Sequence, residues 1–527
     1  MAAIKATIKQ SLPITLTQAH TFAKEGSIKI QSLVEKSLHQ IQSRENLNSF
    51  VNVRSQEELY REAEQSQERY DSGKPLSSID GLPIAIKDNI FVKDMECTAS
   101  SNILKGFRAP IDATVIKRLK AKGALIVGKT NMDEFGMGSL GMYGYDEKKI
   151  IKNPINEEYF AGGSSAGSAA AVRAEQALAS LGTDTGGSVS YPAHCCGLYS
   201  LKPSYGRLSR FGQILYSSSN DVIGPMARTT DDLHSLFSIM EGEDVNDSNC
   251  INFQTISKIR NKERLSESRV EGSLKGVRVG IVQEFDIEEL DGRNRNMQEE
   301  LKKLLKDRGA ELVDVSLPLV KYALPFYFTL VPSEASSNLS RYDGLKYGHQ
   351  FDFNASQSSA QGKTKTELFD YIERVRSEAF GINVKRRVIL GNFLLSSRFE
   401  DFNEKVIDAQ KIRRLIIEEY CSVFEKGNID MIISPVVIGE RPPKISDVIG
   451  QSEKKNPVYE YKMDYYTAYP NATGTPAITI PVQEADQRYG EFPTSFKIQG
   501  CFGEDYHLLR IAKQIEKALK EAKMNFQ

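Results

Sequence analysis

Three polar residues, Lys87, Ser164 and Ser188, lie in contexts that ordinary packing does not explain. Ser188 ends the stretch Gly-Thr-Asp-Thr-Gly-Gly-Ser at 182–188, directly after an apolar run at 177–181. A glycine pair before a serine lets backbone N–H groups converge on a substrate oxygen. Since no histidine has a comparable context, the pattern predicts a serine nucleophile activated by a lysine.

The other two residues offer the proton relay and the base. A hydroxyl is a weak nucleophile at neutral pH, so it needs a base within hydrogen-bond reach that is itself oriented by a third group. Ser164 lies in a glycine-rich loop that opens the small-residue run 169–172, which predicts a closely packed helix with Ser164 at or just before its N-terminus. Lys87 is the first charge after the apolar run 82–86. There it can lose its proton, because desolvation disfavours the ammonium form.

Taken together and in this order, these stretches resemble the amidase signature family. The resemblance rests on Pro-Ile-Ala-Ile-Lys-Asp-Asn at 83–89, Gly-Gly-Ser-Ser at 162–165 and the stretch 182–188, and it runs from about residue 12 to 510. Within the family the chain is similar to the A-subunit (GatA) type of the glutamyl-tRNA(Gln) amidotransferases. That narrower resemblance rests on the stretches 131–138, 202–206, 341–348 and 384–387.

The resemblance implies a role for each matching residue. Ser188 would be the nucleophile and Lys87 the neutral base. Ser164, preceded by a cis peptide bond, would be the proton relay. The backbone N–H groups of Thr185, Gly186, Gly187 and Ser188 would form the oxyanion hole.

Two further matches imply the substrate pocket. Arg387 would clamp the α-carboxylate of glutamine and Asp464 would bind its α-amino group, as a guanidinium fork and a carboxylate do. From the residues alone, Arg387 can equally belong to a solvated basic face at 385–387, and Asp464 can be a helix cap.

Several positions depart from the family pattern. Ala166 replaces a second glycine, and the stretch 189–192 lacks the arginine that usually follows the nucleophile. The stretch 141–146 lacks the Ser/Thr-rich composition that is usual there. Near the end, Ser495 and Lys497 occupy the first and third places of a stretch that usually reads Gly-x-Gln-x-x-Gly. These changes concern the substrate pocket more than the three residues of the triad.

Three other motifs suggest different chemistry and are rejected. The stretch 123–130 fits the phosphate-loop pattern, but its apolar middle predicts a strand, and a phosphate loop follows its strand. It comes after a predicted helix, 112–122, with Asp112 as N-cap and Gly123 as its stop. A Gly-x-Ser-x-Gly match would make Ser165 an esterase nucleophile, yet no buried strand precedes it. Cys195 and Cys196 follow no glycine pair, so buried packing is expected for both.

Composition favours an intracellular enzyme. The 527 residues carry a net charge of −1, which argues against self-sufficient nucleic-acid binding. The six scattered cysteines have neither disulfide nor zinc spacing, and neither a membrane span nor a secretory signal is apparent. Lysines without acids in the first 24 residues, and a resemblance of 192–198 to mitochondrial members of the family, favour the mitochondrial matrix, with the bacterial cytoplasm as the alternative.

Apolar runs alternate with helical patterns along the chain, which predicts the α/β class. With the resemblance, this implies one α/β/α domain over 1–527 with a central mixed sheet flanked by helices and a signature core at 80–235. Polar composition marks 242–274 and 356–364 as surface excursions. The closing helix, 508–522, should pack Leu508, Ala512, Ile515 and Leu519 into the core.

The expected function is that of a glutaminase subunit that forms part of a carbon–nitrogen ligase and supplies ammonia for converting Glu-tRNA(Gln) to Gln-tRNA(Gln). The resemblance implies a heterotrimer with GatB-type and GatC-type subunits, with the tRNA held mainly by those partners. It implies no metal or cofactor on this chain, with ATP and Mg²⁺ used by a partner. A free-standing amidase and a non-catalytic assembly protein remain as alternatives.

Overall fold

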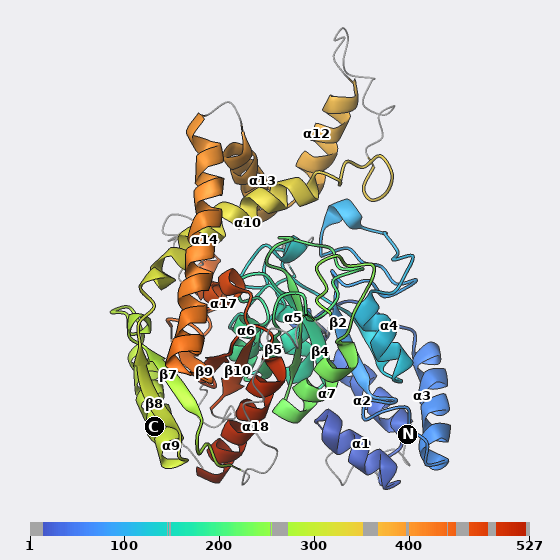
Figure 1. Cartoon of the computed structure of the whole chain (residues 1–527). Helices are drawn as coiled ribbons and strands as arrows, with labels where there is room; N and C mark the ends of the chain where they lie inside the picture. Colours follow the sequence, from blue (N-terminus) through green and yellow to red (C-terminus); the bar gives the residue numbers. More distant parts are fainter. Residues whose placement is uncertain are drawn as a thin grey trace.

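The structure is a computed structural model that describes residues 14–144, 146, 149–252, 255, 272–350, 367–396, 400–439, 441–449, 463–482 and 492–522. The predicted excursion at 356–364 and most of the one at 242–274 lie outside the described residues. The described parts form an α/β structure, which confirms the predicted class (Figure 1).

One mixed sheet runs through the molecule, in the order β1-β3-β2-β4-β6-β5-β10-β11-β9-β7-β8. Two parallel groups, β3-β2-β4 and β9-β7-β8, are joined by antiparallel strands. The strands are β1 (Phe50–Val53), β2 (Pro83–Lys87), β3 (Leu125–Thr130), β4 (Ala179–Asp184), β5 (Tyr199–Lys202), β6 (Val222–Ala227), β7 (Arg278–Val282), β8 (Glu311–Val315), β9 (Met431–Pro435), β10 (Ala477–Pro481) and β11 (Ser495–Gln499).

Helices cover both faces of this sheet. They are α1 (Leu16–Lys24), α2 (Ile30–Ser43), α3 (Gln56–Asp71), α4 (Thr114–Ala121), α5 (Ala166–Arg173), α6 (Ser190–Cys196), α7 (Thr230–Met240), α9 (Gly292–Asp307), α10 (Ala323–Leu339), α12 (Glu367–Ala379), α13 (Ile382–Leu395), α14 (Glu400–Gly427), α15 (Ile445–Val448), α17 (Ala468–Thr473) and α18 (Asp505–Ala522). The largest buried cluster fills one face beneath α2, α4, α7, α9 and α18, and α5 and α6 close the opposite face.

The small residues of α5 let it pack against the sheet at close range. Residues 166–172 are all buried, and a Cβ at Gly167 would come within 2.4 Å of the Asn131 and Ser49 carbonyl oxygens. The closing helix α18 likewise buries Leu508, Ala512 and Ile515 completely. Both predictions of core packing are therefore confirmed.

One predicted helix start is wrong. Asp112 does not cap α4, because that helix begins at Thr114 after Ala113, which offers no side-chain cap. The Asp112 carboxylate instead accepts the Lys93 N–H at 2.8 Å and pairs with Lys120 at 2.7 Å. Gly123 does end the helix, with a positive φ of 87°.

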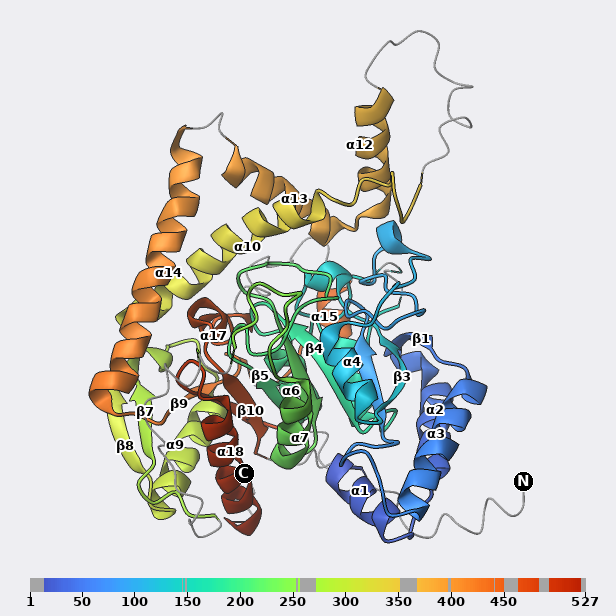
Figure 2. The ribbon, with the colours of Figure 1, turned by 45° about the vertical axis from the view of Figure 1, so that its right-hand side comes forward.

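Helices α10, α13 and α14 form a group beyond one end of the sheet, and α12 projects farthest from it (Figures 1 and 2). Helix α13 packs on α10 and α14. Its first turn is held by the loop after β3, because Glu134 Oε2 accepts the Gly381 N–H at 2.8 Å. Asn383 also donates to the Met137 carbonyl at 3.3 Å. This group therefore sits over the carboxyl ends of β2 and β4, where the predicted active-site residues begin.

Candidate active site

Lys87 ends β2 and is completely buried. Its Nζ lies 2.8 Å from Ser164 Oγ, 2.8 Å from Ser165 Oγ and 3.3 Å from the Thr183 carbonyl oxygen. Burial lowers the pKa of Lys87 to about 7, although nearby carboxylates, led by that of Asp133, oppose the shift. Burial therefore favours the neutral amine, the form that can accept a proton.

Ser164 and Ser165 lie at the start of α5. The peptide bond between Gly163 and Ser164 is cis, as the resemblance implied. Ser165 exchanges hydrogen bonds with the Thr183 backbone, at 3.2 Å through its hydroxyl proton and at 3.3 Å from the Thr183 N–H. Ser165 is thus a buried bridge between α5 and β4, unlike the exposed nucleophile of an esterase.

Ser188 is the one residue of 182–190 that is not fully buried. Its carbonyl accepts the Ser165 N–H at 3.2 Å, so the loop after β4 lies beside the start of α5. Among the described residues, no hydrogen bond joins the hydroxyls of Ser188 and Ser164. The structure therefore brings Lys87 and Ser164 into contact and places Ser188 next to them.

Asp184 shapes the loop that carries Ser188. Its buried carboxylate accepts the N–H groups of Gly187 and Val189, both at 2.7 Å. Gly187 is held at φ 122°, a conformation that favours glycine, and a Cβ there would meet Thr467 at 2.3 Å. The Gly187 N–H therefore donates to Asp184 within the loop, and the expected oxyanion hole stays a prediction.

The remaining donors of the loop are available. In the described chain, the N–H groups of Thr185, Gly186 and Ser188 make no hydrogen bond. Tyr327 packs against Gly186, where a Cβ would come within 2.4 Å of its ring. The Thr467 hydroxyl holds the Gly186 carbonyl at 2.8 Å. Three fixed N–H donors beside a half-buried serine suit a developing oxyanion.

Arg387 lies on the inner side of α13. Its Nε donates to the Tyr216 hydroxyl at 2.9 Å, and Nη1 reaches the Asn383 carbonyl at 3.4 Å. Tyr216 in turn flanks the relay, since a Cβ on Gly136 would lie 3.6 Å from Ser164 Oγ and 3.9 Å from the Tyr216 ring. Arg387 is thus directed to the active site, whereas Arg386 beside it is exposed.

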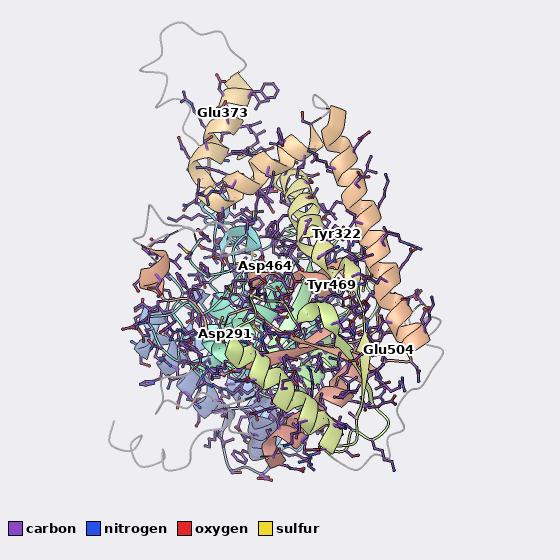
Figure 3. All side chains as sticks on the ribbon, turned by 90° about the vertical axis from the view of Figure 1, so that its left-hand side faces the viewer. Asp291, Tyr322, Glu373, Asp464, Tyr469 and Glu504 are labelled. Carbon is purple, nitrogen blue, oxygen red and sulfur yellow. The ribbon has the colours of Figure 1, made fainter. Side chains whose placement is uncertain are left out.

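Asp464 lies in the middle of the molecule, below α12 and α10 (Figure 3). Its carboxylate accepts a hydrogen bond from Ser139 at 3.4 Å. Burial raises the pKa of Tyr216, with Arg387 opposing the shift and Asp464 adding to it, and both charges also act on the buried Tyr327. An arginine and an aspartate therefore face one region lined by two tyrosines, next to the serines.

Other residues of the site could not be identified from the sequence. The buried Asp221 accepts the Thr185 hydroxyl at 2.6 Å and the Tyr216 N–H at 2.7 Å, which ties the Ser188 loop to the tyrosine loop. Asp133 accepts three N–H groups from 141–143 and lies beside Gly163. Carboxylates that accept hydrogen bonds from distant backbone N–H groups follow no periodic pattern in the sequence. The only sequence signal for these two aspartates was therefore their position near the motifs.

Two further buried lysines lie on the central strands. Lys497 of β11 donates to the Tyr466 carbonyl, and Lys202 of β5 donates to the Pro203 carbonyl at 3.1 Å. Burial lowers the pKa of Lys497 to about 7 and that of Lys202 to about 8. Through the Tyr466 carbonyl, Lys497 therefore fixes the short segment between Asp464 and Thr467 to β11.

The rejected motifs have structural roles. Residues 125–130 are the buried strand β3, and Lys129 pairs with Asp88 at 3.1 Å within the core. Cys195 and Cys196 are fully buried, and burial raises the pKa of the Cys196 thiol to about 12. Among the described residues there is no cluster of metal-ligating side chains and no helix long and apolar enough to cross a membrane.

Comparison with known proteins agrees with this geometry. The chain is 37% identical over 476 residues to the A-subunit of the glutamyl-tRNA(Gln) amidotransferase of Fusobacterium nucleatum, covering 90% of each chain. It is 38% identical over 503 residues to the corresponding A-subunit of Lachnoclostridium phytofermentans, covering 94% of each. The crystal structure of the A-subunit from Thermotoga maritima superposes with a TM-score of 0.70 at 31% identity, covering 93% of this chain and 91% of that one. The amidase family model matches residues 32–509, so the chain belongs to the amidase family.

Proposed function

We propose that this chain is the glutamine-hydrolysing A-subunit of a glutamyl-tRNA(Gln) amidotransferase, which supplies ammonia for the conversion of Glu-tRNA(Gln) to Gln-tRNA(Gln). The observation that carries the proposal is the buried Lys87, whose amine contacts the Ser164 hydroxyl beside Ser188. The likeness to the A-subunits of two bacteria gives the substrate class.

The first half of the reaction forms an acyl-enzyme. Ser188 Oγ attacks the side-chain amide carbon of glutamine while its proton passes to Ser164 Oγ, and the proton of Ser164 passes to neutral Lys87 Nζ. The negative charge on the former amide oxygen is stabilised by the N–H groups of Thr185, Gly186 and Ser188. Lys87 then returns a proton through Ser164 to the leaving nitrogen, and ammonia departs.

The second half regenerates the enzyme. A water molecule attacks the ester carbon of the acyl-Ser188, and Ser164 with Lys87 removes its proton as before. Collapse of the intermediate breaks the ester bond and returns the proton to Ser188 Oγ. Glutamate leaves, so each cycle releases one ammonia and consumes one water.

Arg387 and Asp464 supply the preference for an amino-acid amide. Arg387 is oriented by Tyr216 and can bind the α-carboxylate, while Asp464 can accept from the α-ammonium group. An apolar amide offers neither a carboxylate for Arg387 nor an ammonium group for Asp464. These two residues favour a glutaminase over a free-standing amidase for apolar substrates, and the intact triad residues argue against a non-catalytic assembly protein.

The assembly is part of the proposal. GatB-type and GatC-type subunits would complete a heterotrimer, and the partners would use ATP and Mg²⁺ and hold most of the tRNA. A net charge of −1 supports this division, because a chain that bound tRNA alone would be expected to carry a basic surface.

The compartment is proposed to be the mitochondrial matrix, on the resemblance of 192–198 to mitochondrial members of the family. The similar proteins reported above come from bacteria and do not support this location. Imaging of the tagged protein in its native cells decides between the matrix and the bacterial cytoplasm.

Ammonia release by the purified protein tests the proposed activity. Wild type should release ammonia from glutamine, and Ser188→Ala should lose about a millionfold in rate because the nucleophile is absent. Cys195→Ala is the matched control and should keep wild-type turnover. Wild-type-like turnover by Ser188→Ala, or loss of turnover in Cys195→Ala, would reject the serine mechanism.

A further inference from the structure

Helix α13 is apolar on two opposite sides. Its inner side buries Val384, Gly391 and Leu394 against the rest of the molecule. Its outer side exposes Ile382 and Ile389 by 47% and 69%. A helix of a soluble protein normally keeps one side polar, and one that is apolar all round is normally covered all round.

The outer residues form a regular stripe. Ile382, Arg386, Ile389 and Phe393 follow one another at steps of four, three and four, so they share one helix face, with Leu390 beside them. Phe393 is 43% and Leu390 is 41% exposed. We call these five residues the α13 stripe.

The size of this surface fits a protein interface. The exposed fractions of the four apolar residues, with the exposed Leu395 at the helix end, correspond to roughly 400 Å² of apolar surface. A stable interface of standard size takes about 800 Å² from each partner, of which rather more than half is non-polar. One helix face thus offers most of the apolar surface that such an interface needs.

The charge of the helix indicates the chemistry of the partner. Helix α13 contains Lys385, Arg386 and Arg387 and no acidic residue. Arg387 is turned inward to Tyr216, whereas Arg386 is exposed and makes no hydrogen bond or ion pair among the described residues. The complementary surface is an apolar groove with an acidic rim, the arrangement that receives a helix by anchors at such spacings.

The position of the stripe indicates which partner this is. It lies on the back of the helix whose inner side holds Arg387, and Arg387 donates to Tyr216, which flanks Ser164. Glu134 and Asn383 join α13 to the loop after β3. A partner that binds the outer side of α13 therefore contacts the helix that carries Arg387.

We propose that the α13 stripe is the docking surface for the ammonia-using subunit of the amidotransferase, through an apolar groove with an acidic rim. This inference rests on the proposed function. One helix would then contact both the substrate, through Arg387, and the ammonia-using subunit. The ammonia is therefore released close to the protein that uses it.

The test is co-purification of the full-length chain, tagged, with the co-expressed partner subunits, followed by titration of the purified proteins. Phe393→Glu and Ile389→Glu each place a carboxylate inside the stripe. Each should weaken binding about 30-fold or more, as expected when a central interface residue is lost. Leu76→Glu is the matched control, because Leu76 is 49% exposed and follows α3, which lies away from α13 in Figure 2. It should leave the affinity unchanged.

Arg386→Glu tests the acidic rim and should weaken binding tenfold or more, while Arg386→Lys should largely restore it. All four carboxylate variants should hydrolyse glutamine within about twofold of wild type as isolated chains, which shows that they fold. Wild-type affinity in both Phe393→Glu and Ile389→Glu would overturn the docking surface while leaving the proposed function intact.

Failure of wild type to bind any partner would overturn the proposed function and this inference with it. A wild-type homodimer that Phe393→Glu dissociates, or flotation of wild type with vesicles of anionic lipid that the same variant abolishes, would also overturn the assignment. In those cases the stripe would contact a second copy or a membrane.

Discussion

Lys87 is the residue on which the proposed chemistry depends most, because only its neutral form can accept a proton from Ser164. Burial removes water from the amine and lowers its pKa to about 7, against the pull of three buried aspartates, Asp133, Asp184 and Asp221. The balance leaves the lysine as a base near physiological pH, which is where general-base catalysis is most effective.

The pH profile should therefore report on Lys87. In wild type, kcat/KM for glutamine should rise with pH and level off above about 7, as the amine becomes neutral. Lys87→Arg should be as inactive as Lys87→Ala, because a guanidinium stays protonated. The measurement is ammonia release across the pH range, and substantial activity of the arginine variant would show that Lys87 supplies only charge.

The same group should affect stability in a defined direction. The pKa of Lys87 is about 7 in the folded chain and 10.5 in the unfolded reference. Between these values the unfolded chain binds the extra proton, so the lysine destabilises the fold progressively as pH falls toward 7. Lys87→Met should be more stable than wild type at pH 7, with the difference shrinking toward about pH 10. Urea unfolding at both pH values tests this, and a difference independent of pH would contradict it.

Arg387 and Asp464 should act through binding of the amino-acid part of glutamine. Replacing either by alanine should cost on the order of 2–5 kcal/mol in kcat/KM, while hydrolysis of a small simple amide changes little. Arg386→Ala, one residue away and exposed, is the control in the isolated chain. Normal use of glutamine by both variants would show that Arg387 and Asp464 have structural roles only.

Among the elements, the sequence predicted those with a continuous apolar run or a clear helical pattern. The apolar runs at 82–86 and 177–181 form β2 and β4, the apolar middle of 123–130 lies in β3, and the predicted helix 112–122 contains α4. The prediction worked because parallel strands buried on both sides are continuously apolar.

The missed strands lack that pattern. β6 contains Gly224 and Pro225, which resemble a loop, and β11 reads Ser-Phe-Lys-Ile-Gln, which resembles a half-exposed strand although all five residues are buried. The same limit of sequence-based prediction applies to the residues of the active site. Lys87 and Ser188 are recognisable in short stretches, whereas Tyr216, Asp221 and Tyr327 reach the active site only through tertiary packing.

Strand β11 is predicted to position the substrate pocket through Lys497. Lys497→Met would leave the Tyr466 carbonyl without its donor and loosen the segment from Asp464 to Thr467, lowering kcat/KM for glutamine about tenfold. Lys497→Gln keeps a donor and should recover most of this loss. Lys202→Met is the control, since among the described residues the Lys202 amine bonds only the carbonyl of its neighbour Pro203. Equal losses in Lys497→Met and Lys202→Met would mean that the effect is one of general stability.

At the scale of the whole molecule, the sheet gathers residues from distant parts of the chain at one end. Lys87, Ser164 and Ser188 come from the N-terminal half, Arg387 comes from the helices above the sheet, and Asp464 from the segment before α17. In the proposed function this site releases ammonia and a second protein uses it. The central claim is therefore a division of labour between two proteins.

That claim is tested most directly by a two-by-two comparison in the assembled complex, with wild type and Ser188→Ala each given glutamine or an ammonium salt. Wild type should form Gln-tRNA(Gln) with either donor. Ser188→Ala should assemble normally, fail with glutamine and succeed with ammonium, because it lacks only the hydroxyl that releases ammonia. Glutamine-dependent amidation by assembled Ser188→Ala, or failure of ammonium to restore amidation, would contradict the account.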